Sequence, residues 1–210
     1  MNSTDTSYEV ETRLRFIDKI EFTNLLPSFV PCLTQTEAWS TDFYGLDVFV
    51  AGNLLRVVQV TRGNDLRYFL GWKDRDLGKF ANIRAEIEEE ITYGINNSQI
   101  LQIICANANH AALGDILTEL QAEGYSKFMS FSGYSLSGLY EPLGFKVKLM
   151  NCDQLRYPTL LEIEKTTSSI DEALNIERQL EQFVCNANLL DRVVKLEPPA
   201  LLYSNAISSS

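Results

Sequence analysis

The sequence predicts an α+β protein in which a closed or strongly curved antiparallel β-barrel carries helices packed outside it. Several segments alternate along the chain with the two-residue period of strands, and turn sequences join some of them. Only a few segments have the helical period, and these fall mainly in the second half. The 210 residues suffice for one domain with a sizeable core. We expect a single domain over residues 8–203, with flexible tails over residues 1–7 and 204–210.

The first predicted strand, residues 8–17, has the most regular alternation. One face carries Val10, Thr12, Leu14 and Phe16, and the other is fully ionised. Two interpretations remain open: a face that binds a metal-bound polyphosphate, and a solvated face with cross-strand ion pairs. The residues of the ionised face are Glu9, Glu11, Arg13 and Arg15.

The remaining elements follow from the same kinds of pattern. Residues 54–60 and 66–73 form a predicted hairpin around Arg62-Gly63-Asn64-Asp65. Ser169 and Glu172 make a capping box that starts a helix ending near Asn186. The other predicted elements are strands at residues 83–91, 127–134, 145–151 and 159–165, and helices near residues 100–104 and 113–120, the second closed by Gly124.

Composition excludes several classes of function. The net charge of −10 argues against broad nucleic-acid binding, although clustered arginines can still bind a phosphate. The scattered cysteines (Cys32, Cys105, Cys152 and Cys185) indicate reduced thiols, and the single histidine, His110, leaves little room for imidazole chemistry. Since no apolar run approaches the ~20 residues of a membrane span and no signal peptide is apparent, we expect a cytoplasmic protein.

Two further strands repeat the charged pattern of the first. Arg84, Glu86 and Glu88 share one face of residues 83–91, and Glu162 and Glu164 share one face of residues 159–165. Carboxylates two residues apart on a strand lie about 7 Å apart, so opposed pairs suit one or two hard cations. Interleaved arginines suit phosphate oxygens because guanidinium is planar and permanently charged.

Across residues 8–203 the sequence resembles the CYTH, or triphosphate tunnel, superfamily in short motifs that occur in the family's order. Glu9-x-Glu11-x-Arg13 resembles the family's ExExK signature, with arginine in the lysine place. The other similar segments are Thr41-Asp42-Phe43-Tyr44, Leu55-Arg56-Val57, Gly71-Trp72-Lys73, Arg84-Ala85-Glu86-Ile87-Glu88, and Asp153-Gln154-Leu155 followed by Leu161-Glu162-Ile163-Glu164.

The resemblance implies a closed antiparallel barrel whose charged strand faces line a tunnel for a triphosphate and a divalent metal, Mg²⁺ or Mn²⁺. It implies hydrolysis by a metal-activated water at the terminal phosphorus. Class IV adenylyl cyclases instead use such a tunnel to direct a ribose hydroxyl at the α-phosphorus. Carried over by position, the metal ligands are Glu9, Glu11, Glu162, Glu164 and Glu86; the phosphate-binding residues are Arg13, Arg15, Arg56, Lys73 and Arg84; and the catalytic residues are Arg56, Lys73 and Asp153.

Some of the family's cations are missing. Val58 stands where the family has a second arginine, residues 128–132 lack the Lys-x-Arg pattern, and Ala200 replaces a basic residue. Four hypotheses stay open: hydrolysis of an inorganic, nucleoside or other organic triphosphate; a cyclase; a nucleotide- or polyphosphate-binding module without turnover; and an acidic interaction protein. Residues 21–41 either serve a homodimer or cover a barrel end. Lys195, or Lys146 with Lys148, is a candidate to replace the missing cations.

Overall fold

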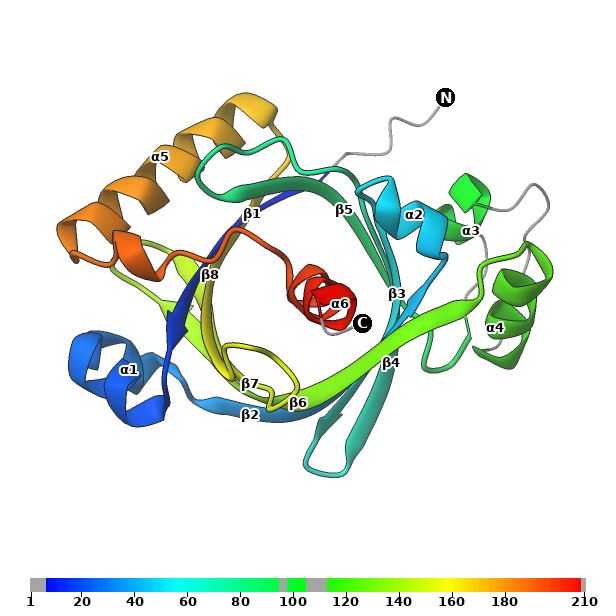
Figure 1. Ribbon diagram of the computed structural model, residues 1–210, viewed down its shortest axis with the longest axis horizontal. Helices are drawn as coiled ribbons and strands as arrows, with labels where there is room; N and C mark the ends of the chain where they lie inside the picture. The colour runs from blue at the N-terminus through cyan, green and yellow to red at the C-terminus, as the bar shows by residue number, and fades with distance from the viewer. Residues whose placement is uncertain (1–6, 95–97, 105–112, 209–210) are drawn as a thin grey trace. The chain divides into compact units, whose positions relative to one another are not determined.

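In the computed structural model, residues 7–94, 98–104 and 113–208 are described, and His110 and Cys105 lie outside them. The strands of these residues are β1 (Ser7–Phe16), β2 (Gln35–Tyr44), β3 (Leu54–Arg62), β4 (Asp65–Lys73), β5 (Asn82–Glu90), β6 (Lys127–Tyr140), β7 (Phe145–Asn151) and β8 (Thr159–Thr167). They close into a barrel in the order β1-β5-β4-β3-β2-β6-β7-β8 (Figure 1). The predicted fold class is therefore confirmed.

The helices are α1 (Lys19–Leu25), α2 (Leu46–Val50), α3 (Gln99–Ile104), α4 (Leu113–Ala122), α5 (Ile170–Asn186) and α6 (Pro198–Ser208), with 3₁₀ turns η1 (Pro27–Cys32) and η2 (Leu190–Arg192). The chain forms two compact units. Unit 1 comprises residues 1–37, 76–84 and 133–210, and unit 2 comprises residues 38–75 and 85–132. The single domain predicted over residues 8–203 stays a prediction.

Most predicted elements are present within one or two residues, and the differences have local causes. Strand β6 continues to Tyr140 instead of ending at residue 134, because Ser135, Ser137 and Gly138 interrupt its apolar alternation without interrupting its pairing with β7. Helix α6 reaches Ser208 and so includes most of the predicted C-terminal tail. Helices α1 and α2 are too short to show a helical period.

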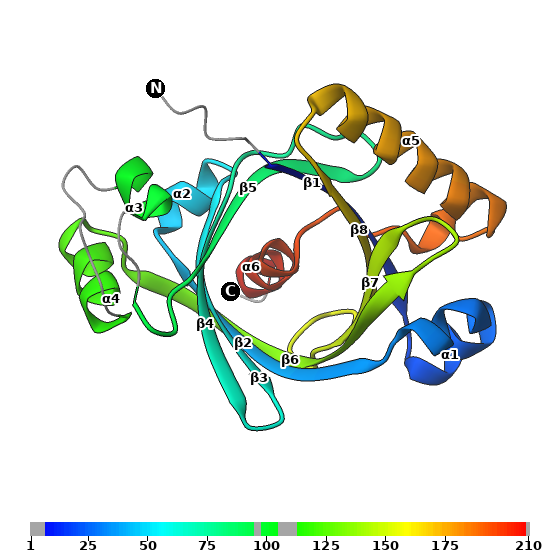
Figure 2. The same ribbon diagram turned by 180° about the vertical axis from the view of Figure 1, so that it is seen from behind.

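In unit 1 the apolar face of β1 is the core face, as its alternation predicts. Helix α5 lies along β1 and β8 (Figure 1 and Figure 2), and its residues Ile176 and Leu180 are buried in one cluster with Val10 and Leu14. The capping box is confirmed, since the Ser169 side chain accepts a hydrogen bond from the Glu172 backbone N–H. Burying these apolar groups is the main stabilising contribution of this face.

The first part of residues 21–41, up to Leu33, packs on the same core, and the last part belongs to β2. Phe22 of α1 and Phe29 of η1 are at most 1% exposed and belong to the same apolar cluster as Ile176 of α5. Phe22 also meets Phe16 edge to face, with ring centroids 5.5 Å apart. The homodimer considered for this stretch stays a prediction.

A loop before β5 is held by one carboxylate of α5. Oxygen Oε1 of the buried Glu177 accepts the backbone N–H groups of Lys79, Phe80 and Ala81 at 2.7, 2.7 and 3.0 Å. Gly78 is required here, because a Cβ at this position would lie 2.0 Å from the Ala81 carbonyl oxygen. Glu177 therefore replaces the strand partners that these N–H groups lack.

We expect Glu177→Ala to lower the free energy of unfolding by about 2–3 kcal/mol, because three loop N–H groups lose their shared acceptor. Urea denaturation measures this. Glu177→Gln keeps an oxygen acceptor and should lose clearly less, and Glu181→Ala, at an exposed position of the same helix, should change little. Equal losses for the alanine and glutamine variants would show that the acceptor does not matter.

The same loop is fixed from its other side by Asp76. Its carboxylate accepts from the Gly78 and Ile83 backbone N–H groups and pairs with Lys195 Nζ, each at 2.9 Å. Burial acts to raise the pKa of the Asp76 carboxyl, but the bonds from Lys195, Ile83 and Gly78 outweigh it and lower the pKa. The loop is thus tied both to α5 and to the segment before α6.

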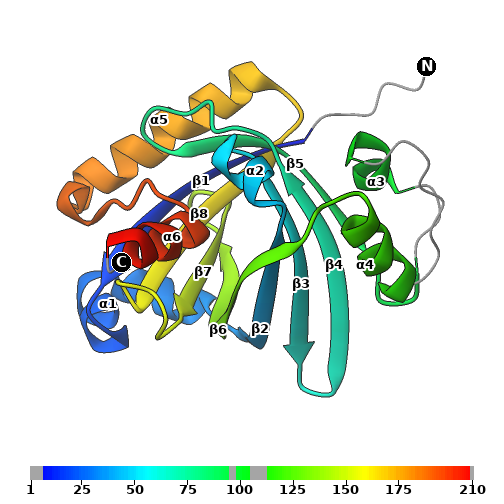
Figure 3. The same ribbon diagram turned by 45° about the vertical axis from the view of Figure 1, so that its right-hand side comes forward.

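Unit 2 is built on the predicted β3–β4 hairpin, whose turn places Gly63 at a φ of 58°. Strand β4 lies beside α4 (Figure 3), and Leu70 is buried with Ile116 and Leu120 of that helix. Ile100 of α3 belongs to the same core. Both helices predicted from the apolar period are therefore confirmed.

Within the described residues, no helix combines the length and apolar character needed to cross a membrane.

Candidate functional site

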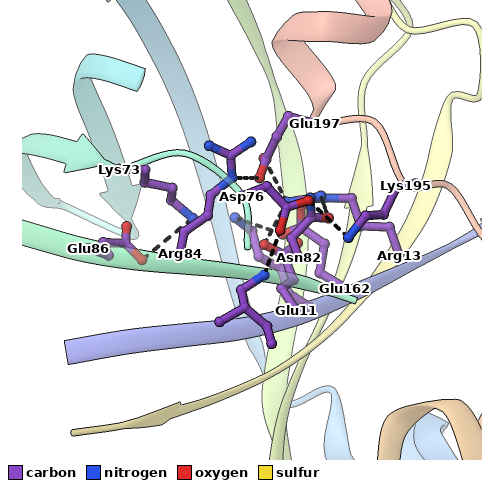
Figure 4. Close-up of polar contacts among 12 residues, drawn as sticks. Glu11, Arg13, Lys73, Asp76, Asn82, Arg84, Glu86, Glu162, Lys195 and Glu197 are labelled. Carbon is purple, nitrogen blue, oxygen red and sulfur yellow. Dashed lines mark hydrogen bonds and ion pairs between the residues drawn. The ribbon is translucent and has the colours of Figure 1, made fainter. Parts of the chain in front are cut away.

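The ionised face of β1 is buried and forms part of a compact polar cluster in unit 1. Antiparallel pairing with β8 sets Arg13 opposite Glu162, and Glu11 opposite Glu164. Arg13 is only 1% exposed and Glu11 only 3%, which argues against a solvated strand face. We call the group the Arg13 cluster; its members are Glu11, Arg13, Asn82, Arg84, Glu162 and Glu197 (Figure 4).

Arg13 is at the centre of the cluster and donates through all three of its nitrogens. Its Nε bonds to Glu162 Oε1 at 3.2 Å and its Nη1 to Asn82 Oδ1 at 3.0 Å. Its Nη2 bonds to both Glu11 Oε2, at 2.6 Å, and Glu197 Oε2, at 2.7 Å. These contacts come from β1, β5, β8 and the residue before α6, so the guanidinium joins four segments of unit 1.

The cluster holds more carboxylates than guanidinium groups, and the pKa values reflect this. Burial raises the pKa of the Glu11 carboxyl well above its usual range, although the Arg13 guanidinium opposes the shift. Burial also disfavours the charge on Arg13, but Glu11, Glu197 and Glu162 together raise the pKa of Arg13. Burial therefore disfavours the ionised form of Glu11, and a further cation nearby would stabilise that form.

Glu197 links the second arginine to the cluster. Its Oε1 forms an ion pair with Arg84 Nε at 3.1 Å, while its Oε2 bonds to Arg13. One carboxylate therefore bridges two guanidinium groups, each through a different oxygen. Lys148 adds a cation beside the cluster, with its Nζ 3.7 Å from Glu162 Oε2.

The other candidate replacements for missing cations are placed differently. Lys146 lies with its Nζ 3.7 Å from Glu164 Oε1, but its side chain is 66% exposed. Lys195 donates to the Gly78 carbonyl oxygen at 3.2 Å and to the Ala81 carbonyl oxygen, and so holds the loop before β5. Of these lysines, Lys148 is the one that accompanies a member of the Arg13 cluster.

Unit 2 contains a second charged group on β3, β4 and β5. Arg56 Nη2 lies 3.0 Å from Glu86 Oε1 and 3.5 Å from Glu88 Oε2. Lys73, only 3% exposed, places its Nζ 3.5 Å from Glu86 Oε2. Gly71 is paired with Arg56, and a Cβ at Gly71 would lie 3.0 Å from Arg56 Nε. The missing side chain thus leaves the room that the Arg56 side chain occupies.

The remaining predicted site residues lie outside both charged groups. Arg15 donates to the Asp191 carbonyl oxygen at 3.0 Å and lies 4.9 Å from the centre of the Tyr157 ring. These contacts favour a structural role for Arg15 beside η2. Asp153 is exposed in the turn after β7. Glu9 is half-buried on β1, and Glu164 lies next to Lys146.

The carboxylates fit a metal ion only in part. Oxygen Oε1 of Glu11 is buried and, among the described residues, has no hydrogen-bond partner, so it is suited to a cation. However, no three Asp, Glu, His or Cys side chains in the described parts of the chain are grouped closely enough to hold a metal together. Arg13 bonds to both Glu11 and Glu162 and takes oxygens that a metal would need. Metal binding therefore stays a prediction.

Glu197 and Asn82 belong to the cluster but carry no signal in the sequence pattern. Glu197 precedes two prolines in a segment without alternation, and Asn82 opens a strand whose charged residues begin at Arg84. Both lie far from Arg13 along the chain, 184 and 69 residues away. Only covariation with Arg13 in related sequences could have pointed to them.

No protein-family model and no curated protein matches this sequence. Solved structures do match. PH1819 from Pyrococcus horikoshii OT3 is 16% identical with a TM-score of 0.72, over 94% of this chain and 99% of that one. HpAC1 from Hippeastrum, a candidate adenylyl cyclase with a dominant triphosphatase activity, is 16% identical with a TM-score of 0.59, over 95% and 96%. A chain of the Schizosaccharomyces pombe Mediator head module is 9% identical with a TM-score of 0.55, over 85% and 95%.

The closed barrel is therefore a fold that this chain shares with HpAC1 and PH1819, and the closed antiparallel barrel that the resemblance implies is confirmed. In this chain the barrel brings Arg13 and Arg84 together, and Glu197 bridges the two arginines.

Proposed function

We propose that this protein is a cytoplasmic triphosphatase that binds a small-molecule triphosphate together with Mg²⁺ or Mn²⁺ and hydrolyses it. The observation that carries the proposal is the buried Arg13 cluster, in which guanidinium groups and carboxylates meet away from solvent. Burying charged groups carries a desolvation cost even when they are paired, and phosphate oxygens with a cation would complement both signs of charge in the cluster. HpAC1, with the same fold, has a dominant triphosphatase activity.

Each charged group has a role in this proposal. Arg13 and Arg84 hold phosphate oxygens in unit 1. The phosphate-binding and catalytic roles of Arg56 and Lys73 in unit 2 rest on the resemblance. Glu11, with its unpaired oxygen, is the first metal ligand, assisted by Glu162. The metal, when bound, supplies charge neutralisation and an acidic water. The roles carried over for Glu9, Glu164, Glu86 and Asp153 rest on the resemblance alone.

Binding without turnover is the alternative that a specific observation favours. The positions of Val58, Ala200 and residues 128–132 lack the expected cations, and Glu197 occupies both guanidinium groups of the Arg13 cluster. Transition-state charge is more sensitive to missing cations than ground-state binding is. A cyclase of the class IV type would share the binding site and differ in its products.

Product analysis with a Glu11→Gln variant tests the proposal. We expect the wild type to release orthophosphate from inorganic triphosphate or ATP with Mg²⁺ or Mn²⁺, and to stop when EDTA is added. Glu11→Gln should reduce the rate on the order of 100-fold, because one charged ligand becomes a neutral amide. Glu141→Gln, at an exposed turn, is the matched control and should keep the wild-type rate.

The products distinguish the hypotheses. Cyclic nucleotide with pyrophosphate would indicate a cyclase. A melting temperature raised by triphosphate without any product would indicate the binding module. If the wild type forms no product and gains no stability from any triphosphate, the proposed site is wrong.

A further inference from the structure

Glu197 makes the contacts that a phosphate group would make at the same place. Its two oxygens reach separate guanidinium groups, Oε2 to Arg13 Nη2 at 2.7 Å and Oε1 to Arg84 Nε at 3.1 Å. Carboxylate and phosphate are both anions that bridge arginines through distinct oxygens. We propose that Glu197 is an internal competitor, which must leave Arg13 and Arg84 before a triphosphate can bind there. This inference rests on the proposed function.

A phosphate would compete with Glu197 because the hydrogen-bond donors of Arg13 already have acceptors. Its Nη2 already donates to Glu11 and Glu197, and its Nε and Nη1 donate to Glu162 and Asn82. A phosphate oxygen at Nη2 therefore has to replace one of two carboxylates. An additional anion beside both would also meet their negative charge at short range.

Glu197 is the carboxylate that can leave more easily. Glu11 is in the middle of β1, paired with β8 and two residues from Arg13. Glu197 lies outside any strand, and the preceding Leu196 is 51% exposed. Withdrawing Glu197 therefore needs a change in a short connecting segment, whereas withdrawing Glu11 disturbs the barrel.

The anchors of this segment show where movement would begin. Val194 donates its N–H to the Arg13 carbonyl oxygen at 2.9 Å, and Lys195 pairs with Asp76. Both anchors precede Leu196, so residues 194 and 195 can stay in place while Glu197 moves. Leu201 donates its N–H to the Glu197 carbonyl oxygen at 3.0 Å, which makes Glu197 the N-cap residue of α6.

The prolines after Glu197 reduce the number of backbone N–H groups that could bond to its side chain. An N-cap side chain ordinarily accepts from the N–H of the second or third helical residue. The second residue here is Pro199, which has no N–H, so only Ala200 could donate in this way. The contacts of the carboxylate lie instead with Arg13 and Arg84, the groups that a triphosphate would compete for.

A Glu197→Gln variant tests the competition. We expect it to bind inorganic triphosphate about tenfold more tightly than the wild type in EDTA, because glutamine competes for guanidinium without a negative charge. Calorimetry measures the dissociation constants, and circular dichroism verifies the fold of the variant. Glu181→Gln is the matched control, since it removes one negative charge at an exposed site of α5 and should bind like the wild type.

Hydrogen exchange of the wild type gives a readout that does not depend on the variant folding. Saturating triphosphate should speed exchange of the Leu201 amide at least severalfold, because this amide bonds to the Glu197 carbonyl oxygen. Slower or unchanged exchange, or a folded Glu197→Gln variant that binds equally or more weakly, would overturn the competition and leave the proposed function intact. If the wild type and all variants bind no triphosphate, the proposed function fails and the competition fails with it.

Discussion

Arg13→Met is expected to lower the free energy of unfolding by about 3–5 kcal/mol, the usual loss when one partner of a buried ion pair is removed. The reason is that Glu11, Glu162 and Glu197 would remain buried without the guanidinium that bonds to each of them. Urea denaturation measures the loss. Methionine is chosen because it fills a similar volume, so that the change reports charge rather than a cavity.

Two variants sharpen this result. Arg13→Lys keeps the positive charge but loses the planar fork, so its loss should be intermediate. Arg67→Met, the matched control, removes an arginine that is paired with Asp65 and Glu90 on the surface, and should leave the urea midpoint nearly unchanged. If Arg13→Met unfolds at the wild-type urea concentration, the cluster does not contribute to the stability of the barrel.

Gly138→Ala is expected to lower the free energy of unfolding by about 3 kcal/mol, the upper part of the range for overpacked sites. A Cβ at this position of β6 would lie 1.7 Å from the Cys32 carbonyl oxygen. The Thr34 N–H bonds to the Ser137 carbonyl oxygen at 3.1 Å and holds the two segments together, so the clash has no simple relief. Thermal or urea unfolding measures the effect.

The neighbouring Ser137→Ala is the matched control for this position. It changes a side chain of the same strand but keeps the backbone bond to Thr34, so its stability should be close to that of the wild type. A Gly138→Ala variant as stable as Ser137→Ala would mean that the segment near Cys32 can move away from β6.

Strand β1 and helix α5 could be predicted because their patterns are local. The alternation around Arg13 predicts a strand with one apolar and one ionised face, and the sequence after Ser169 predicts a capped helix. Strand β2 was not predicted, since residues 35–40 mix polar and apolar groups on both faces; only its end, Thr41-Asp42-Phe43-Tyr44, was noted as a similar segment. Local patterns indicate the type of secondary structure of a segment, but not the segments with which it packs.

The candidate site was predicted only as far as it lies on alternating strands. Glu11, Arg13, Arg84 and Glu162 were singled out from their spacing, and they do meet in one cluster. Their burial could not be predicted, because an ionised strand face is equally compatible with solvent. Arg15 has the same spacing as Arg13 but binds the Asp191 carbonyl oxygen, since the direction of a long side chain depends on what surrounds it.

The sequence by itself determined the barrel strands other than β2, and the face on which each charge of β1, β5 and β8 stands, because side chains alternate strictly along a strand. Only the tertiary structure decided what those charges touch. It brought Glu197, 184 residues from Arg13, between two arginines that are predicted from the sequence to bind phosphate. Such a contact depends on chain closure and burial, which no spacing in the sequence encodes.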